Sequence, residues 1–385
     1  MSFTPKFRNL SSPRSEMVGD ISTLEAQGAA GLDSIGAVRG EIKRSTQTTG
    51  ASGNITGRIS ALDFTKGTLV LVMVLYHWLN YFVGLQSPLY RYLSFLPPSF
   101  ICITGFLISH VYLSKNRISD RRLPRRLLIR GSKLLAIFIL LNMGISVLIP
   151  GAMNGGRVFG NYSVRSLESV FVTGNTAGGR TVAFNILVPI SYLLLFSALL
   201  LIAHRHCKQI FNALTLLCFL TIFILYVNVS ESRNLELLTI GFLGISMGQI
   251  SINRVNHFLK HPVAVIVAYL CYVVAITVWN SRYPLQVVGV LLTLCLIYLV
   301  GMASGETGRM QQWLILLGKY SLFGYIAQIA ILQLIRRSLS MELTTWASGA
   351  SFLAAIVLTI LTVEVVDRGR AKSSTVDRLY AAVFS

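Results

Sequence analysis

Three ionisable residues lie in the first apolar stretch of the chain, ALDFTKGTLVLVMVLYHWLNYF, at a spacing that would let them share a site. Lys66 and His77 are eleven positions apart, which on an α-helix is three turns plus about 20°, so both fall on one face roughly 16 Å apart. Asp63 joins that face. An imidazole can exchange a proton near neutral pH, and an ammonium group can hold an anion. Because such groups are costly in lipid, the face they share should point to the protein interior or to a hydrated cavity.

The same three residues also permit a purely structural interpretation. Lys66 would extend to the head groups at the end of the helix, with Asp63 three residues earlier as its ion-pair partner. His77 would then be a packed residue without a chemical role. The spacing alone leaves both interpretations open.

The composition of the 385-residue chain indicates a membrane protein. Hydrophobic residues make up 53% of it and charged residues only 13%, and the mean hydropathy is +0.64. A soluble enzyme would carry about a quarter charged residues. A disordered chain would hold few aromatic residues, whereas this one has 20 Phe and 15 Tyr. Both classes are therefore excluded.

Basic residues give the chain a net charge of +19, but they lie mainly in short connectors between apolar runs. There they would orient a membrane protein and meet anionic head groups, so no nucleic-acid partner is expected. The five cysteines are scattered and form no C-x-x-C pair, and His204 and His206 fall on different faces of a helix end. We therefore expect no metal site and no disulfide framework.

Apolar runs of about 20 residues, the length needed to cross a bilayer as a helix, follow one another from Phe64 onward. The sequence predicts an all-α, polytopic integral membrane protein with about ten transmembrane helices. Residues 1–57 are polar and are predicted to form a disordered cytosolic tail, and residues 58–385 the transmembrane domain. The predicted spans are 64–85, 92–114, 131–150, 183–203, 209–228, 235–252, 262–280, 284–303, 314–335 and 346–366.

The connectors on the side of the two termini hold more than twice as many Lys and Arg residues as those on the other side. This places both termini in the cytosol of a protein of the inner (plasma) membrane. Two connectors stand out: the basic stretch 115–133, predicted to be partly helical, and the Gly- and Asn-rich outer loop from about 151 to 182. An outer loop of this length suggests a functional role.

Three segments resemble the membrane-bound acyltransferases of the acyltransferase-3 type, near the branch that succinylates periplasmic glucans. That family carries an Arg, ten intervening residues and a His in its first span, where this chain has Lys66 and His77. In SFICITGFLISHVYL, Thr104 begins a Thr-Gly-Phe triplet where the family has Ser-Gly-Phe. In LLGKYSLFGYIAQIAIL, Ser321 and Tyr325 match a late Ser, Tyr and His cluster.

The chain departs from the family pattern at three places. Lys66 for Arg loses the bidentate fork but keeps the positive charge, and Thr104 for Ser keeps the hydroxyl. Gln328 stands where many members have His, which leaves His77 as the base.

The resemblance implies an O-acyltransferase that moves an acetyl or succinyl group from acyl-coenzyme A to a hydroxyl of a periplasmic or cell-surface carbohydrate. Acyl-coenzyme A is a donor substrate, and no permanently bound cofactor is expected. His77 would take the proton of the attacking hydroxyl or carry the acyl group itself, two roles that the sequence does not separate. The remaining implied site residues form two groups. Donors to the developing oxyanion are Ser321, Tyr325, Gln328 and Asn80, and the donor-binding residues at the inner mouth beside Lys66 are Asp63, Arg125, Arg126 and Arg130.

Two rival functions remain open at this point. A polytopic transporter or flippase of a glycolipid or small solute would use the buried charges of the first span as its coupling site. A non-catalytic membrane sensor or assembly partner would dispense with Lys66 and His77.

Overall fold

A computed structural model describes residues 59–83, 89–113, 122–148, 169–174, 184–206, 210–228, 232–250, 252–279, 285–304, 308–339 and 345–384. Throughout these ranges the regular structure is helical and no strand is present. The expected all-α class is confirmed. The predictions for residues 1–57, and for most of the outer loop 151–182, lie outside the described ranges.

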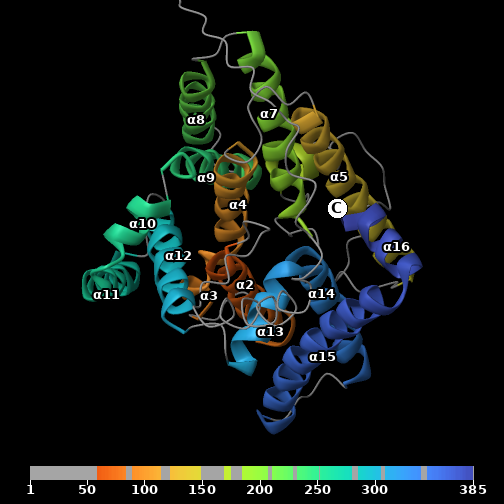
Figure 1. Cartoon of the computed structure of the whole chain (residues 1–385). Coiled ribbons are helices and arrows are strands. Elements are labelled where there is room, and N and C mark those ends of the chain that lie inside the picture. The colour runs from red at the N-terminus through yellow and green to blue at the C-terminus, as the bar shows by residue number, and fades with distance from the viewer. Residues whose placement is uncertain are drawn as a thin grey trace, which may run out of the picture. The chain divides into compact units, whose positions relative to one another are not determined.

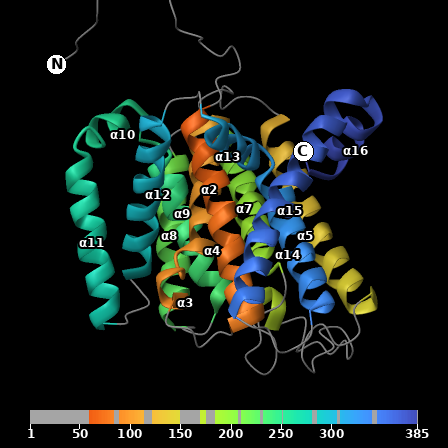
Figure 2. The same ribbon diagram turned by 90° about the horizontal axis from the view of Figure 1, so that it is seen from below.

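Helix α2 (Ser60–Trp78) is the central element of the bundle (Figure 2). Its buried side chains are mostly apolar and occupy the first four turns, and α12, α13 and α14 pack directly on it, as do α4 and α15. The helix continues without a break into a π-helical turn, η1 (Leu79–Val83). Lys66 and His77 therefore share one uninterrupted helix, as predicted.

The other helices surround α2 in groups that Figures 1 and 2 show in chain colours. In one group α4 packs against α9, α9 against α7 and α8, and α7 against α5. In another α11 packs against α12, and on the opposite side of α2 from these two α15 packs against α14 and α16. Their bounds are α3 Leu89–Tyr92, α4 Leu96–Leu107, η2 Ile108–Leu113, α5 Arg122–Leu148, η3 Ser169–Thr173, α7 Leu187–His206, α8 Ile210–Asn228, α9 Arg233–Met247, α10 Ile252–Phe258, α11 Pro262–Trp279, α12 Leu285–Ala303, α13 Arg309–Lys319, α14 Ser321–Ser338, α15 Thr345–Lys372 and α16 Ser374–Phe384.

Helices α4 and α9 approach so closely that only glycine fits at their crossing. A Cβ atom on Gly105 would collide with the carbonyl of Gly241, and one on Gly244 with the carbonyl of Cys102. Small residues at helix crossings are typical of membrane bundles, where close backbone approach replaces a hydrophobic driving force. Gly105, which the sequence placed in a family-like motif, is therefore a packing residue.

Six helices in the described part of the chain are long and apolar enough to cross a membrane: Ser60–Val83, Leu89–His110, Arg122–Gly144, Pro262–Trp279, Leu285–Ala303 and Trp346–Lys372. A seventh would be the pair α13 and α14, if it counts as one span. The protein is thus a polytopic membrane protein. Each of the ten predicted segments overlaps a helix, but the count of ten stays a prediction.

Two predicted spans had the wrong form. The segment 314–335 is not one straight helix, because α13 and α14 meet at Tyr320 with a bend of 95°. The third span begins at Arg122 and not at 131, so the second half of the basic connector is the first part of α5. The prediction that this connector is partly helical is confirmed.

The first turn of α2, and helices α10, α13 and α16, lie at one end of the helical region, while α3 lies at the other (Figure 2). We call the first of these the α13 end. It corresponds to the side predicted to be cytosolic.

Candidate active site

His77 lies one residue before the end of α2, directly ahead of the π-helical turn η1. π-Helical turns inside helices are frequent at functional sites, because the extra residue breaks the regular hydrogen bonding. The imidazole ring lies 5.9 Å from the ring of Tyr325 and 5.4 Å from that of Tyr76, measured between centroids. Its Nε2 atom is buried and has no hydrogen-bond partner among the described residues. An unpaired buried nitrogen is costly unless a substrate or a water molecule completes it.

Helix α14 places two further predicted residues on the side of His77. Tyr325 is buried and makes the ring contact with His77, and Gln328 lies one turn further along the same face. Gln328 is fully buried, yet neither its Nε2 nor its Oε1 has a partner in the described part of the chain. Ser321, seven positions before Gln328, begins α14 at the bend and shares this face. A buried amide with both atoms unpaired is rare and calls for an explanation, such as a catalytic role or a bound water molecule.

Phe184 extends the cluster through Tyr325. Its ring is buried and meets Tyr325 edge to face, with centroids 5.9 Å apart and planes at 86°. The backbone of Phe184 has φ of 60°, a left-handed conformation that bulky residues rarely adopt. Such strain persists only where surrounding structure enforces it, and it gathers at active sites.

A short segment of the long outer loop supports Phe184. The amide of Asn185 donates to the carbonyl of Gly174, which follows the π-helical turn η3. Asn234, at the start of α9, donates to the carbonyls of Val170 and Phe171 at 3.1 and 3.0 Å. The described segment of the outer loop, 169–174, is thus joined to α9 and to the residue that follows Phe184. Sequence reasoning missed Phe184, and only the unusual length of the loop pointed to this region.

Lys66 occupies the other end of α2. Its Nζ pairs with Asp63 Oδ1 at 2.6 Å, and both side chains are largely buried. The predicted pairing is confirmed. Helix α13 crosses this turn at backbone contact: a Cβ atom on Gly67 would collide with the carbonyl of Leu314, and one on Gly318 with that of Asp63. The ion pair is therefore held under α13, and roughly 16 Å of helix separates it from His77.

The other predicted residues lie on α5, η1 and α4. Arg125 and Arg126 are exposed and Arg130 is half-buried on α5, which packs on α7. Figure 2 shows the start of α5 at the same end of the bundle as the start of α2. Asn80 is half-buried in η1. The Thr104 hydroxyl donates to the carbonyl of Phe100 in its own helix.

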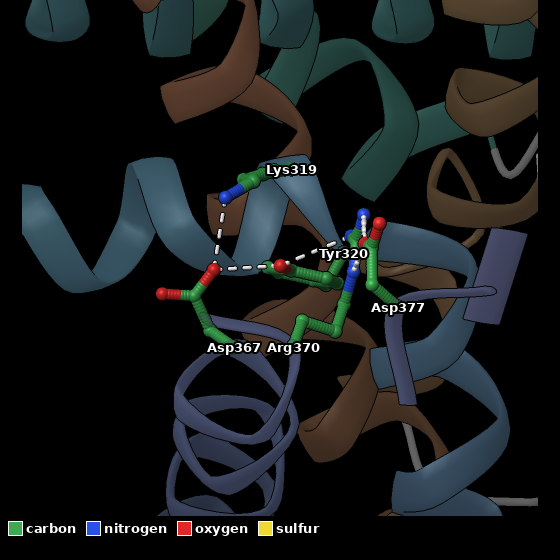
Figure 3. Close-up of polar contacts among 5 residues, drawn as sticks. All are labelled: Lys319, Tyr320, Asp367, Arg370 and Asp377. Atoms are coloured by element: carbon green, nitrogen blue, oxygen red, sulfur yellow. Dashed lines mark hydrogen bonds and ion pairs between the residues drawn. The ribbon is translucent and has the colours of Figure 1, made fainter. Parts of the chain in front are cut away.

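A second polar cluster, shown in Figure 3, fixes the bend between α13 and α14. The hydroxyl of buried Tyr320 donates to Asp367 Oδ1 at 2.6 Å and accepts from Arg370 at 3.1 Å. Asp367 also pairs with Lys319 at 2.8 Å. Arg370 in turn pairs with Asp377 of α16 at 2.6 Å. We call these five residues the Tyr320 network.

Aromatic rings extend the network to α16. The Arg370 guanidinium lies 4.3 Å from the ring centroid of Tyr380, which stands edge-on to Tyr320 at 5.2 Å. Burial and the neighbouring Tyr320 raise the pKa of Tyr380 to about 12, against the opposing effect of Arg370. Tyr380 therefore stays neutral at physiological pH, and its ring remains a cation–π partner. Tyr320, Arg370 and Asp377 could not be predicted to cluster, because their contacts join separate helices.

Comparison with known proteins identifies the family of the chain. A family model described as an acyltransferase domain matches residues 59–364, more than three quarters of the chain. The match includes both ends of α2 and the whole of α14. No curated protein and no solved structure gives a match. Within the described ranges no group of three or more His, Cys, Asp or Glu residues is placed to hold a metal ion.

Proposed function

The chain belongs to the acyltransferase-3 family of membrane acyltransferases, and from this premise we propose that it moves an acetyl or succinyl group from acyl-coenzyme A to a hydroxyl of a periplasmic or cell-surface carbohydrate. The observation that carries the proposal is the His77 Nε2 atom, buried and unpaired beside Tyr325. A packed structural histidine would have its ring nitrogens satisfied by neighbouring groups.

The proposed reaction is a single acyl transfer with His77 as general base. Nε2 accepts the proton of the sugar hydroxyl as its oxygen attacks the thioester carbonyl carbon, which forms a tetrahedral oxyanion. The oxyanion then collapses, the C–S bond breaks, and the proton passes from the imidazole to the departing sulfur. The products are the carbohydrate ester and free coenzyme A. A positioned base of this kind contributes about 10²- to 10⁴-fold in rate.

Gln328 and Tyr325 are the proposed donors to the oxyanion. An amide N–H and a phenol O–H can both hydrogen-bond a developing negative charge, and such donors are most effective in a dry site. Both side chains are buried. The two unpaired atoms of Gln328 also suit an acceptor sugar, because its Oε1 can accept from a second hydroxyl.

The donor would enter at the α13 end, which we propose faces the cytosol, with both termini on that side of the inner (plasma) membrane. Lys66 keeps a positive charge there, and Asp63 fixes its side chain. Arg125, Arg126 and Arg130 supply further positive charge at the same end for the phosphates of coenzyme A. The acceptor hydroxyl would approach from the end where Phe184 and the outer loop lie.

The proposal is tested by measuring release of free coenzyme A thiol from acetyl- and succinyl-coenzyme A by the detergent-purified protein. We expect Lys66→Ala to raise the donor concentration at half-maximal rate with little change in kcat, since Lys66 lies far from the reacting atoms. We expect His77→Ala to lower kcat with donor affinity retained. Binding of acyl-coenzyme A is measured in the same samples. If the reaction requires an acceptor, coenzyme A release would be absent whenever the acceptor is missing, even though the enzyme is active. If the wild-type protein showed no donor binding and no coenzyme A release with carbohydrate acceptors present, that result would contradict the proposal and favour a transporter.

A further inference from the structure

A partly open cavity of about 100 Å³ lies at the α13 end of the bundle, away from His77. Five helices line it: α2, α4, α9, α10 and α12. The lining side chains that decide its chemistry are Thr65, Cys102, Met247, Val255, Cys295 and Tyr298. One water molecule needs about 10–15 Å³ on the same scale, so the cavity has room for several connected heavy atoms.

The surface of this cavity offers no polar atom to a ligand. Its two hydroxyl-bearing residues are already committed, since Thr65 donates to the carbonyl of Ala61 at 2.8 Å and Tyr298 donates to Asn256 at 3.1 Å. Buried water needs two to four polar partners, and a head group or a sugar needs several more. The chemistry of the wall therefore fits hydrocarbon alone.

The position of the cavity connects it with the bilayer. Helix α12 packs on α2 and α4, α9 packs on α4, and α10 follows α9 and lies beside the end of α12 (Figures 1 and 2). Ile250, which lines the cavity, and Phe258, next to the lining residue Leu259, are both exposed apolar side chains. In a chain that crosses a membrane, exposed apolar side chains beside an opening favour contact with lipid over water.

We propose that this cavity binds one hydrocarbon chain of a bilayer phospholipid. The occupant is a lipid tail and not the acyl group of the donor, because an acetyl or succinyl group is too short or too polar for a wholly apolar cavity. The proposal does not rest on the proposed reaction. The cavity also borders the ion pair: Leu62 and Thr65 line it and flank Asp63 and Lys66 on α2. A bound chain would thus support the turn that holds this pair.

The test is photo-crosslinking of the full-length protein in nanodiscs that contain a phospholipid with a diazirine near the end of one acyl chain, followed by peptide mass spectrometry. We expect adducts on lining residues, including the Leu62–Thr65 turn of α2, which belongs to the central helix. Adducts confined to outward-facing residues of α11, where Val274 and Val278 are exposed, would overturn the proposal.

A matched pair of variants sharpens the test. Cys295→Phe places a larger side chain in the cavity, and we expect it to lower the lining adducts at least fivefold. Cys271→Phe makes the same change at an exposed position on α11 and should leave them unchanged. If Cys295→Phe elutes as aggregate, Cys295→Leu replaces it, with a smaller loss expected. Undiminished lining adducts in a folded Cys295 variant, or lining adducts from a photoreactive long-chain acyl-coenzyme A but none from the phospholipid, would overturn the proposal.

Discussion

His77 and Gln328 hold polar atoms in a buried part of the bundle without using them for folding. The Nε2 of His77 and both amide atoms of Gln328 are unpaired in the described structure. A buried polar group left without a partner costs roughly 1–3 kcal/mol. This cost is explained if these atoms bind a substrate. At these residues the side chain that favours catalysis then differs from the one that would favour stability.

Gln328→Leu should reveal this separation. Removing both unpaired amide atoms should leave the free energy of unfolding unchanged or raise it by about 1 kcal/mol. The same change should lower kcat by about 10- to 10³-fold, because an oxyanion donor is lost. Thermal unfolding and coenzyme A release measure the two effects.

Gln333→Leu is the control, because its amide donates to the hydroxyl of Tyr81 at 3.2 Å. Its loss should destabilise the protein by about 1 kcal/mol. A drop in stability of Gln328→Leu as large as that of Gln333→Leu would show that Gln328 is a structural residue.

Substitutions of Phe184 provide a second test, because the packing of its ring stabilises the fold and its backbone strain destabilises it. Both Phe184→Ala and Phe184→Gly lose the buried ring and should cost about 3–5 kcal/mol. Glycine adopts φ of 60° freely, so Phe184→Gly should be the more stable of the two by about 1 kcal/mol. Denaturant unfolding of the two variants gives the difference directly. Equal stability, or an advantage for alanine, would argue against a strained backbone at Phe184.

How far the sequence predicts these residues depends on whether their signal is local. His77 and Lys66 could be found because ionisable side chains in an apolar stretch are conspicuous. Tyr325 and Gln328 came only from the resemblance, since nothing in their own spacing points to His77. Phe184 could not be found, because its role depends on a backbone conformation and on a contact with a residue 141 positions later.

Helix α13 is the element that links the two ends of the proposed site. It crosses α2 at Gly67 and Gly318, above the Asp63–Lys66 pair, and then turns by 95° into α14, which carries Tyr325 and Gln328. The Tyr320 network fixes that turn from α15 and α16. A displacement of α13 would therefore change the donor end of the site, while the helix that faces His77 stays anchored.

Gly318→Ala tests this arrangement. The new methyl group would collide with the carbonyl of Asp63, so α13 must move away from α2. We expect a loss of about 1–3 kcal/mol in stability and a higher donor concentration at half-maximal rate. Gly349→Ala on α15 is the control, because open space surrounds that position and alanine favours a helix. If Gly318→Ala and Gly349→Ala had the same stability and the same donor affinity, the close crossing of α2 and α13 would matter neither for folding nor for donor binding.

Most helices of the bundle can be predicted from the sequence, but the bend between α13 and α14 cannot. Hydropathy continues through Tyr320, so the sequence favoured one span over 314–335. The hydroxyl, carboxylate and guanidinium groups that stabilise the break come from Asp367 and Arg370, some fifty residues later. Helix α16 was likewise unforeseen, because 11 residues are too few for a span.

At the scale of the whole molecule, the two ends of α2 serve different compartments in the proposed reaction. The α13 end carries Lys66 and the basic start of α5, and the opposite end carries His77 near the outer loop. The proposed cytosolic placement of the α13 end rests on the bias of basic residues in the connectors. It can be tested without any assay of catalysis.

Thiol labelling of single cysteines in a cysteine-free background tests the orientation. Leu89→Cys on α3 and Ser374→Cys on α16 are exposed and lie at opposite ends of the bundle (Figure 2). We expect a membrane-impermeant maleimide to label Leu89→Cys from the outside of the inner membrane and Ser374→Cys only in inverted vesicles. Labelling of both from one side would contradict the described bundle, and the reverse pattern would contradict the proposed orientation.

The most direct test of the central claim is the rate of coenzyme A release by His77→Ala at saturating donor, measured with donor binding in the same sample. His257→Ala, which removes an exposed histidine on α10, is the matched control. The account predicts that His77→Ala lowers the rate by about 10²- to 10⁴-fold with donor affinity intact, while the control keeps the wild-type rate. A rate for His77→Ala within twofold of wild type would contradict the assignment of His77 as the base.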